Sequence, residues 1–317
     1  MSAIRWLLQM MAALMLFVAP RAMACPLCAN SLQLTISAQE LIYAEHSVLA
    51  MPVADRNEFQ VVTVIKGEAP PDNKITGGVF RGVTNSEKPL LLIRDDDWIQ
   101  WVNFGQVSPD QADWLRKLSR TKRTIDMTQA EWREQVAYFL PYLENVEPMV
   151  AEIAFNEFAS APYDALRSLK PRLDAAAIRA WLHEPKLAKR QPVYLLLLGI
   201  AGTEQDARWL EERIEIARKT HSTNNLTPLL GALLEIHGIA GVDQIEKLYL
   251  GDATRTKPEI EAALVALRVH ADTDGASVRD RVMQAFRLFA REHPSMASLV
   301  GPDLAASNKA EPKTASR

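Results

Sequence analysis

The 317-residue sequence has few cysteines, few histidines and no excess of basic residues. It contains two Cys and six His, and its 36 Lys and Arg residues face 39 Asp and Glu residues, so the formal net charge is −3. Two cysteines cannot build a disulfide framework. Without a basic excess there is no charge to hold a phosphate backbone, so we expect no nucleic-acid partner. Hydrophobic residues make up 48% of the chain, as in globular proteins.

Motifs of catalysis and cofactor binding are missing as well. The glycine clusters Gly77-Gly78 and Gly199 to Gly202 lack the Lys and Ser/Thr of a nucleotide-binding loop. Neither a G-x-S-x-G elbow nor an H-E-x-x-H pair occurs. We therefore predict no catalytic residues and no cofactor. Whether the protein is an enzyme stays open, with a non-enzymatic protein favoured.

The first 24 residues have the pattern of a secretory signal peptide. Arg5 precedes an apolar run from Trp6 to Val18, and Ala22-Met23-Ala24 places alanine at the two positions that a signal peptidase reads. The run has 13 residues, whereas a membrane span needs about 20. We expect an exported protein of the bacterial periplasm or extracellular space, without a transmembrane span. Loss of residues 1–24 removes two arginines and no acid, so the net charge changes from −3 to −5.

Both cysteines belong to one CxxC motif, Cys25-Pro26-Leu27-Cys28, directly after the expected cleavage site. Outside the cytosol such a pair is expected to be oxidised, and the short loop that it closes would shape only a local turn. The alternatives for Cys25 and Cys28 are a thiol-redox pair and a soft-metal site. A lipid anchor on Cys25 is not favoured, because Ala22 and Met23 stand where a lipoprotein signal usually has a larger aliphatic and then a small residue.

Residues 25–106 are expected to form a small β domain. A short amphipathic helix at 31–41 is followed by strand candidates separated by Gly and Pro turns, and this pattern is typical of a small OB-type barrel. Trp98 and Trp101 are candidates for a binding surface, with an anchor to the next domain as the alternative. Asp95 to Asp97 are expected to form a solvated hairpin turn rather than a calcium loop. The five strand candidates are 46–53, 58–66, 74–80, 88–94 and 98–104.

Residues 107–304 are expected to form an α-helical domain. Thr128 to Glu131 is a capping box, and apolar residues recur at helical spacing after it. The tetrad Gly199-Ile200-Ala201-Gly202 recurs 39 residues later as Gly238-Ile239-Ala240-Gly241, close to the HEAT period of about 40–47 residues. The first glycine of each tetrad is expected to end a helix with positive φ. The predicted helix pairs are about 147–170, 187–218, 224–250 and 256–292.

These patterns predict an α+β protein with two domains, an OB-like β-barrel and a HEAT-like repeat array, followed by a disordered tail at 305–317. His183, His237 and His270 are expected near helix C-termini in structural roles, because no two of them have metal-ligand spacing. A stack of helix pairs presents a broad surface that usually binds protein. We therefore expect a protein partner from the cell envelope.

Two resemblances accompany this interpretation. Residues 25–105 resemble the netrin-like (tissue-inhibitor-of-metalloproteinase-type) OB module in the N-terminal cysteine pair, the helix-strand start and the strand Val61 to Gly67. That resemblance implies peptidase inhibition through the Cys25 amine, although the family pairs Cys-x-Cys with distant cysteines that this chain lacks. The whole layout resembles exported bacterial proteins of the planctomycete type, uncharacterised as a group, which implies no activity. The residues that carry the second resemblance are Cys25-Pro26-Leu27-Cys28, Val64-Ile65-Lys66-Gly67 and Phe158-Ala159-Ser160-Ala161-Pro162-Tyr163.

The leading hypothesis is a non-enzymatic exported binding or scaffold protein that uses its helical surface. A thiol-redox or soft-metal-binding protein acting through Cys25 and Cys28 is the first alternative. A netrin-like peptidase inhibitor is the second.

Overall fold

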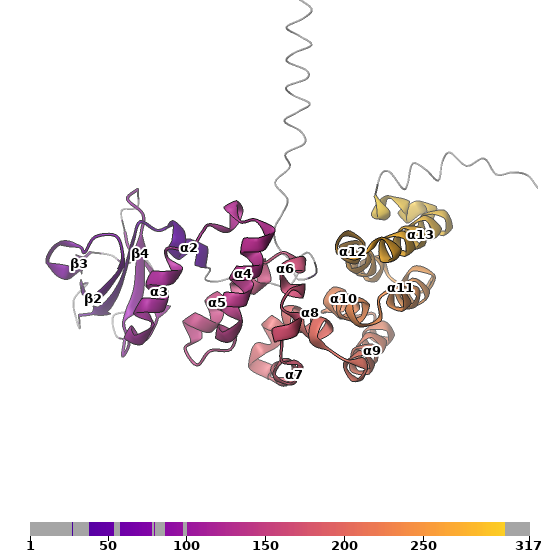
Figure 1. The fold of residues 1–317 in the computed structure, drawn as a ribbon, viewed down its shortest axis with the longest axis horizontal. Coiled ribbons are helices and arrows are strands. Elements are labelled where there is room, and N and C mark those ends of the chain that lie inside the picture. Colours follow the sequence, from indigo (N-terminus) through magenta and orange to yellow (C-terminus); the bar gives the residue numbers. More distant parts are fainter. Residues whose placement is uncertain are drawn as a thin grey trace, which may run out of the picture.

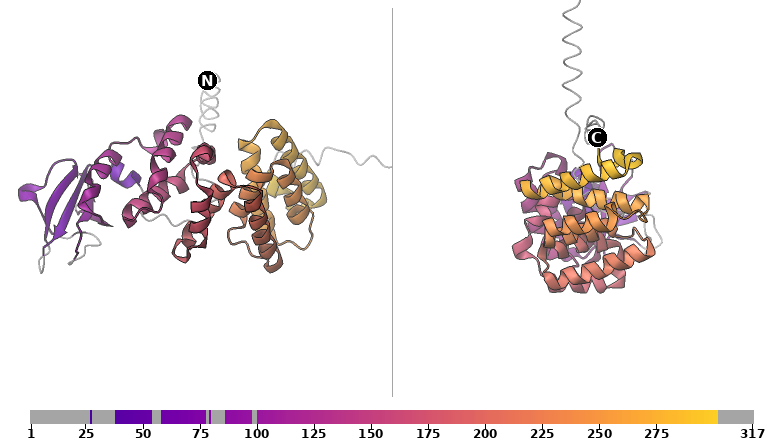
Figure 2. Two further views of the ribbon diagram at one scale, coloured as in Figure 1. Left: turned by 60° about the horizontal axis from the view of Figure 1, so that its bottom comes forward. Right: turned by 90° about the vertical axis from the view of Figure 1, so that its right-hand side faces the viewer.

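The computed structural model describes Leu27 and residues 38–53, 58–77, 79, 86–97 and 100–301. It contains an antiparallel sheet at one end of an elongated molecule and a helical region that extends to the other end (Figures 1 and 2). The predicted mixture of a β part and an α part is confirmed. The signal peptide, Cys25, Cys28, Trp98 and the tail lie outside the described residues.

The sheet has the order β3-β2-β1-β4-β5, and every described pairing is antiparallel. β1 lies at the centre because it pairs with both β2 and β4. Closure into a barrel would require the two edge strands to pair, and the pairings of the described strands leave β3 and β5 at opposite edges. The strands are β1 (His46–Pro52), β2 (Glu58–Lys66), β3 (Lys74–Thr76), β4 (Leu90–Arg94) and β5 (Val102–Gln106).

The predicted strands are confirmed with shifted ends. β3 stops at Thr76 because Gly77 follows with φ of 103°, which leaves the extended region. β4 begins after Pro89, which has no N–H to contribute to a ladder. β5 begins at Val102 and runs two residues beyond the predicted Phe104.

Each face of the sheet carries its own apolar cluster. Leu49, Leu91 and Ile93 point to the helical side, where they join the main core together with Trp114 and Leu115 of helix α3 (Ala112–Leu118). The opposite face carries the smaller cluster of Val48, Ala50, Phe59, Ile75, Leu90, Leu92 and Trp101. The main core continues from the sheet through all the helical layers, so no gap in packing marks the predicted boundary at residue 106.

The helical region consists of antiparallel helices in two layers. Helices α8, α10 and α12 pack side by side, and α7, α9, α11 and α13 cover them (Figure 1). The helices are α2 (Ala38–Tyr43), α3, α4 (Gln129–Phe139), α5 (Pro148–Ser160), α6 (Tyr163–Arg167), α7 (Ala175–His183), α8 (Gln191–Ala201), α9 (Glu204–Thr220), α10 (Leu226–His237), α11 (Ile239–Ile245), α12 (Lys257–Thr273) and α13 (Ala276–Glu292). A π turn, Glu246–Leu250, continues α11, and a 3-10 helix, Pro294–Val300, follows α13.

The predicted helix pairs match this order, and the capping box at Thr128 and Glu131 is present. His183 and His237 are the last residues of α7 and α10, and His270 lies in the last turn of α12, as predicted. Among the described residues, no helix combines the length and apolarity needed to cross a bilayer.

The first glycines of the two tetrads have different structural roles, and this corrects part of the sequence interpretation. Gly238 ends α10 with φ of 54°, as expected. Gly199, in contrast, lies inside α8, where a Cβ would be only 2.5 Å from the Cα of Ala232 on α10. The prediction that Gly199 ends a helix is wrong, because its lack of a side chain serves the close approach of α8 and α10.

Candidate functional site

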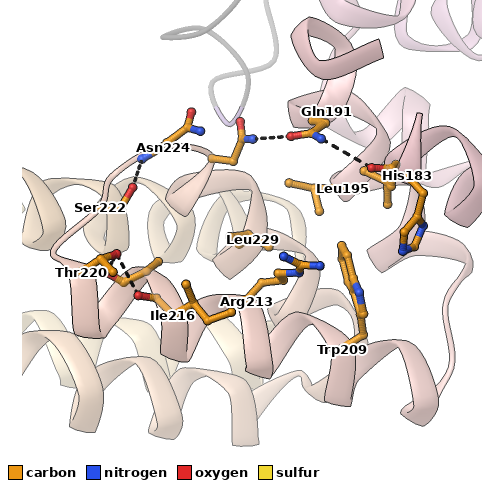
Figure 3. A pocket seen from close by; sticks show the side chains of 13 residues that line it. His183, Gln191, Leu195, Trp209, Arg213, Ile216, Thr220, Ser222, Asn224 and Leu229 are labelled. Carbon is orange, nitrogen blue, oxygen red and sulfur yellow. Dashed lines mark hydrogen bonds between the residues drawn. The ribbon is translucent and has the colours of Figure 1, made fainter. Parts of the chain in front are cut away.

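A groove follows helix α9. A separate pocket of about 520 Å³ lies beside Lys88, Phe104 and Glu147. α9 provides one wall, the C-terminal turn of α7 provides the other, and α8 and α10 form the floor. The groove has two adjoining parts with cavity volumes of about 320 and 330 Å³, which share Leu182, His183 and Trp209. Figure 3 shows the first part, which lies between Trp209 and the loop that joins α9 to α10.

Helix α9 forms the wall of the first part, and four of its five lining residues are large or polar. Trp209, Arg213, Ile216 and Thr220 recur at helical spacing and so lie on one face of α9. The residues that bind α9 to the stack, among them Leu210 and Ile214, are buried on another face. As a result, one face of α9 lines the groove while another face packs against the neighbouring helices. Trp209, Arg213 and Ile216 point toward the floor in Figure 3.

Trp209 lies at the junction of the two parts and contacts a cationic side chain. The guanidinium carbon of Arg213 is 5.1 Å from the centre of the indole ring, within the range of a cation–π interaction. The imidazole of His183 lies 6.1 Å from the same ring, between centroids. His183 Nδ1 donates to the carbonyl of Arg179 at 2.7 Å, so Nε2 is the ring nitrogen left for a ligand.

Amide side chains line the far end of the first part. Asn225 Nδ2 donates to Gln191 Oε1 at 3.0 Å, and Gln191 Nε2 reaches the carbonyl of Leu182 at 3.5 Å (Figure 3). Asn225 adopts the left-handed region with φ of 56° at the start of α10, which Asn tolerates better than most residues. The carboxamide oxygen of Asn225 and the side chain of Asn224 remain available to hydrogen-bond a ligand.

The two parts of the groove differ in charge. The lining of the first part contains Arg213 and His183 and no carboxylate. The second part contains Asp206, which pairs with Arg179 at 2.8 Å, together with the exposed residues Arg208 and Glu212. Burial opposes ionisation of Asp206, yet hydrogen bonds from Thr203 and Arg179 hold the pKa of that carboxyl below its ordinary value. The net character of the first part is therefore positive, because of Arg213, over an apolar floor of Leu195 and Leu229.

A second cluster lies inside the helical stack, where Glu235, His270 and Asp274 bring their ligand atoms within 4.8 Å of one another. Arg167 Nε is 2.7 Å from Glu235 Oε1, and Arg167 Nη1 is 2.6 Å from Asp274 Oδ1. His270 Nδ1 lies 3.0 Å from Asp274 Oδ2, and His270 Nε2 lies 3.1 Å from the carbonyl oxygen of Gly231.

The carboxylates of Glu235 and Asp274 are already paired with the guanidinium of Arg167. Burial opposes ionisation of Asp274, but the hydrogen bond from His270 and the charge of Arg167 hold its pKa below the ordinary value. Since one guanidinium bridges both carboxylates, a metal ion would have to displace Arg167. We therefore assign the cluster a structural role, joining α6, α10 and α12. The search for metal-ligand spacing in the sequence did not find this cluster, because Glu235 is distant in sequence from the other two residues. His270 and Asp274 alone are one helical turn apart.

The CxxC motif is represented among the described residues by Leu27 alone. Leu27 is 3% exposed and contributes to the main core. A Cβ on Gly231 of α10 would lie 3.1 Å from Leu27 Cδ1 and 3.1 Å from Leu196 Cδ2 of α8. The residue between Cys25 and Cys28 is thus seated where α8 meets α10, next to the carbonyl that receives the His270 hydrogen bond.

Of the two tryptophans singled out in the β part, Trp101 is among the described residues and is buried. Trp101 is 7% exposed, lies edge-on to His46 at 6.4 Å and has Arg94 5.2 Å from its ring centre. Asp96 lies in the turn after β4 and accepts from His46 Nε2 at 2.8 Å. The aspartates of this turn therefore serve local contacts, in line with the expected hairpin turn.

Glu157 is a buried acid that the sequence analysis did not single out. It lies on α5, is 1% exposed, and accepts from Gln135 Nε2 of α4 at 3.2 Å. Burial raises its pKa to about 7, although the hydrogen bonds from Gln135 and from the Ala38 backbone act in the opposite direction. It lies in the core, away from the groove.

Comparison with protein-family models, with curated proteins and with solved structures gives no match for this chain. The functional argument therefore depends on the groove and its chemistry.

Proposed function

We propose that this chain is an exported, non-enzymatic binding or scaffold protein of the bacterial cell envelope. In this proposal the helical region is a HEAT-like array that holds a protein partner on its surface. The observation that carries the proposal is the groove beside α9, whose walls and floor come from four successive helices. A surface shared by successive helices is formed by their stacking, and solenoid proteins bind other proteins on surfaces of this kind.

The chemistry of the groove supports binding more than catalysis. Its first part combines a half-buried tryptophan, apolar floor residues and carboxamides, a composition typical of sites of protein recognition. Trp and Arg are the residues that most often dominate the energy of such contacts, and here Trp209 and Arg213 are in contact.

Site-specific photo-cross-linking in cells that express the full chain tests the proposal. A benzophenone amino acid would replace Ile216 on α9, Ile239 on α11, or Val62 on β2, which are 54%, 41% and 50% exposed and so comparably accessible. We expect a defined protein adduct at Ile216 or Ile239 and none at Val62. Adducts confined to Val62, or no adduct at either helical position, would contradict the proposal.

A second candidate is a thiol or soft-metal function of Cys25 and Cys28. The observation that favours it is the burial of Leu27 against Gly231 and Leu196, which fixes the middle of the motif on the helical stack. A Cys25→Ser, Cys28→Ser double variant is expected to lose thiol exchange or Zn²⁺ uptake if this function exists. Unchanged behaviour in both assays rejects it. The netrin-like inhibitor would act through Cys25, outside the described residues, and stays a prediction.

A further inference from the structure

We propose that the first part of the α9 groove binds an extended peptide segment of the partner in which an Asp or Glu lies beside a large apolar side chain. This inference rests on the proposed binding function and adds the chemistry of the ligand. It follows from charge, shape and hydrogen-bonding groups that converge on Trp209.

Charge is the first argument. Arg213 contacts the ring of Trp209, and no carboxylate of the described residues pairs with it. Two other arginines of the helical region already have acidic partners: Arg179 pairs with Asp206, and Arg190 pairs with Glu144. A carboxylate from a ligand would give Arg213 an ion pair of the kind that Arg179 and Arg190 already have. The planar guanidinium is suited to hold it through two parallel hydrogen bonds.

The apolar surface is the second argument. Ile216 is 54% exposed on the wall and lies opposite Leu195 and Leu229 of the floor. A large aliphatic or aromatic side chain that enters between them would remove this surface from water, with a gain of about 25 cal/mol for each Å² buried. A ligand with a carboxylate alone would leave the apolar floor exposed to water. We therefore expect the ligand to carry both a carboxylate and a large apolar side chain.

Hydrogen bonding and length favour a peptide over a small acid. The carboxamides of Asn224 and Asn225 can accept from an N–H and donate to a carbonyl, the two groups that a peptide backbone repeats. The groove also continues past Trp209 into its second part, where the exposed residues Arg208 and Glu212 of α9 lie. Two adjoining cavities accommodate several residues of extended chain.

Peptide selection tests the inference with the purified protein. A phage-displayed library of random dodecapeptides is selected against it, and enriched peptides are synthesised and titrated by fluorescence anisotropy. We expect enrichment of Asp or Glu adjacent to Leu, Ile, Met or Phe. Peptides that lack this pairing, or failure to enrich any peptide, would overturn the inference. Binding of small apolar acids at the groove without peptide selection would also overturn it.

Matched variants locate the site. Arg213→Gln is expected to weaken peptide binding at least tenfold, whereas Arg287→Gln, which removes an exposed arginine of α13, leaves it unchanged. Arg213→Glu should restore binding to a peptide in which Lys replaces the acidic residue. Equal affinities for the wild type and Arg213→Gln, or no rescue by the charge swap, would refute the assignment. Cross-links at Ile239 together with these negative results would leave the scaffold function standing, so the two failures are distinguishable.

Discussion

At the scale of single residues, Glu157 gives the clearest prediction for pH dependence. Its pKa is about 7 in the fold, against an ordinary value of 4.5. Between these values the folded chain binds one proton more than the unfolded chain, so the free energy of unfolding falls as pH rises from about 4.5 to 7 and then levels off. The shift corresponds to roughly 2–4 kcal/mol lost across this window.

Glu157→Gln is expected to remove that slope, because a carboxamide keeps an acceptor for Gln135 and Ala38 without ionising. Urea denaturation at pH 5, 6, 7 and 8 measures the effect. The variant should be more stable than the wild type at pH 8. Identical slopes for the two proteins would show that Glu157 does not titrate in this range.

Arg167 is the cation that bridges the two carboxylates of the buried cluster. Its removal in Arg167→Ala would leave Glu235 and Asp274, whose side chains are 5% and 11% exposed, without their bridging cation. We expect a loss of about 3–5 kcal/mol in unfolding free energy, the range for breaking a buried ion pair.

The matched control for Arg167→Ala is Arg133→Ala. Arg133 is 52% exposed and pairs with Asp164 at 2.6 Å on the surface, where such pairs contribute about 0–1 kcal/mol. Chemical denaturation of both variants gives the comparison. Equal losses in the two would contradict the role assigned to the buried cluster.

The residues of the proposed binding groove were the hardest to predict from sequence. Trp209 belongs to no motif, and the groove depends on Leu182, Gln191 and Asn225, which come from other elements. The helical recurrence of Trp209, Arg213 and Ile216 was the one local signal, and it becomes informative only when another face of α9 is known to be buried. His270 was expected to be structural, and the ion pairs around it agree.

At the scale of elements, Gly199 decides how closely two helices approach. A Cβ there would lie 2.5 Å from the Cα of Ala232, and backbone cannot yield as a flexible side chain would. Gly199→Ala is therefore expected to force α8 and α10 apart, at a cost of about 1–3 kcal/mol. Thermal unfolding followed by circular dichroism measures it.

Gly251→Ala is the control for this substitution. Gly251 has a φ of −91° and its nearest non-bonded neighbour would be 3.6 Å from the new Cβ, so the methyl group fits. Its effect should stay within about 0.5 kcal/mol. If Gly199→Ala is equally mild, the close contact of α8 and α10 does not determine their packing.

Element types were predictable because local patterns specify them. Gly and Pro turns separated the segments that became β1 to β5, and helical recurrence specified the segments that became α8 to α13. The repeat itself was misjudged in detail, because Gly199 and Gly238 occupy different positions in their helices. A short sequence match cannot distinguish a glycine that permits positive φ from one that permits close packing.

At the scale of the whole molecule, the central claim is that continuous stacking of helices creates a recognition surface. The sequence predicted the stack, whereas the central place of β1 in the sheet and the path of the groove depend on pairings between distant segments. The unbroken core from sheet to α13 implies that the surface is carried by one cooperative body.

Hydrogen–deuterium exchange of the purified chain, with and without the partner recovered by cross-linking, tests this claim most directly. The account predicts slower exchange on binding in α9, in the last turn of α7 and in the loop from 221 to 225, with the strands of the sheet unchanged. Protection confined to β1 to β5, or spread evenly over the chain without a maximum at α9, would contradict it.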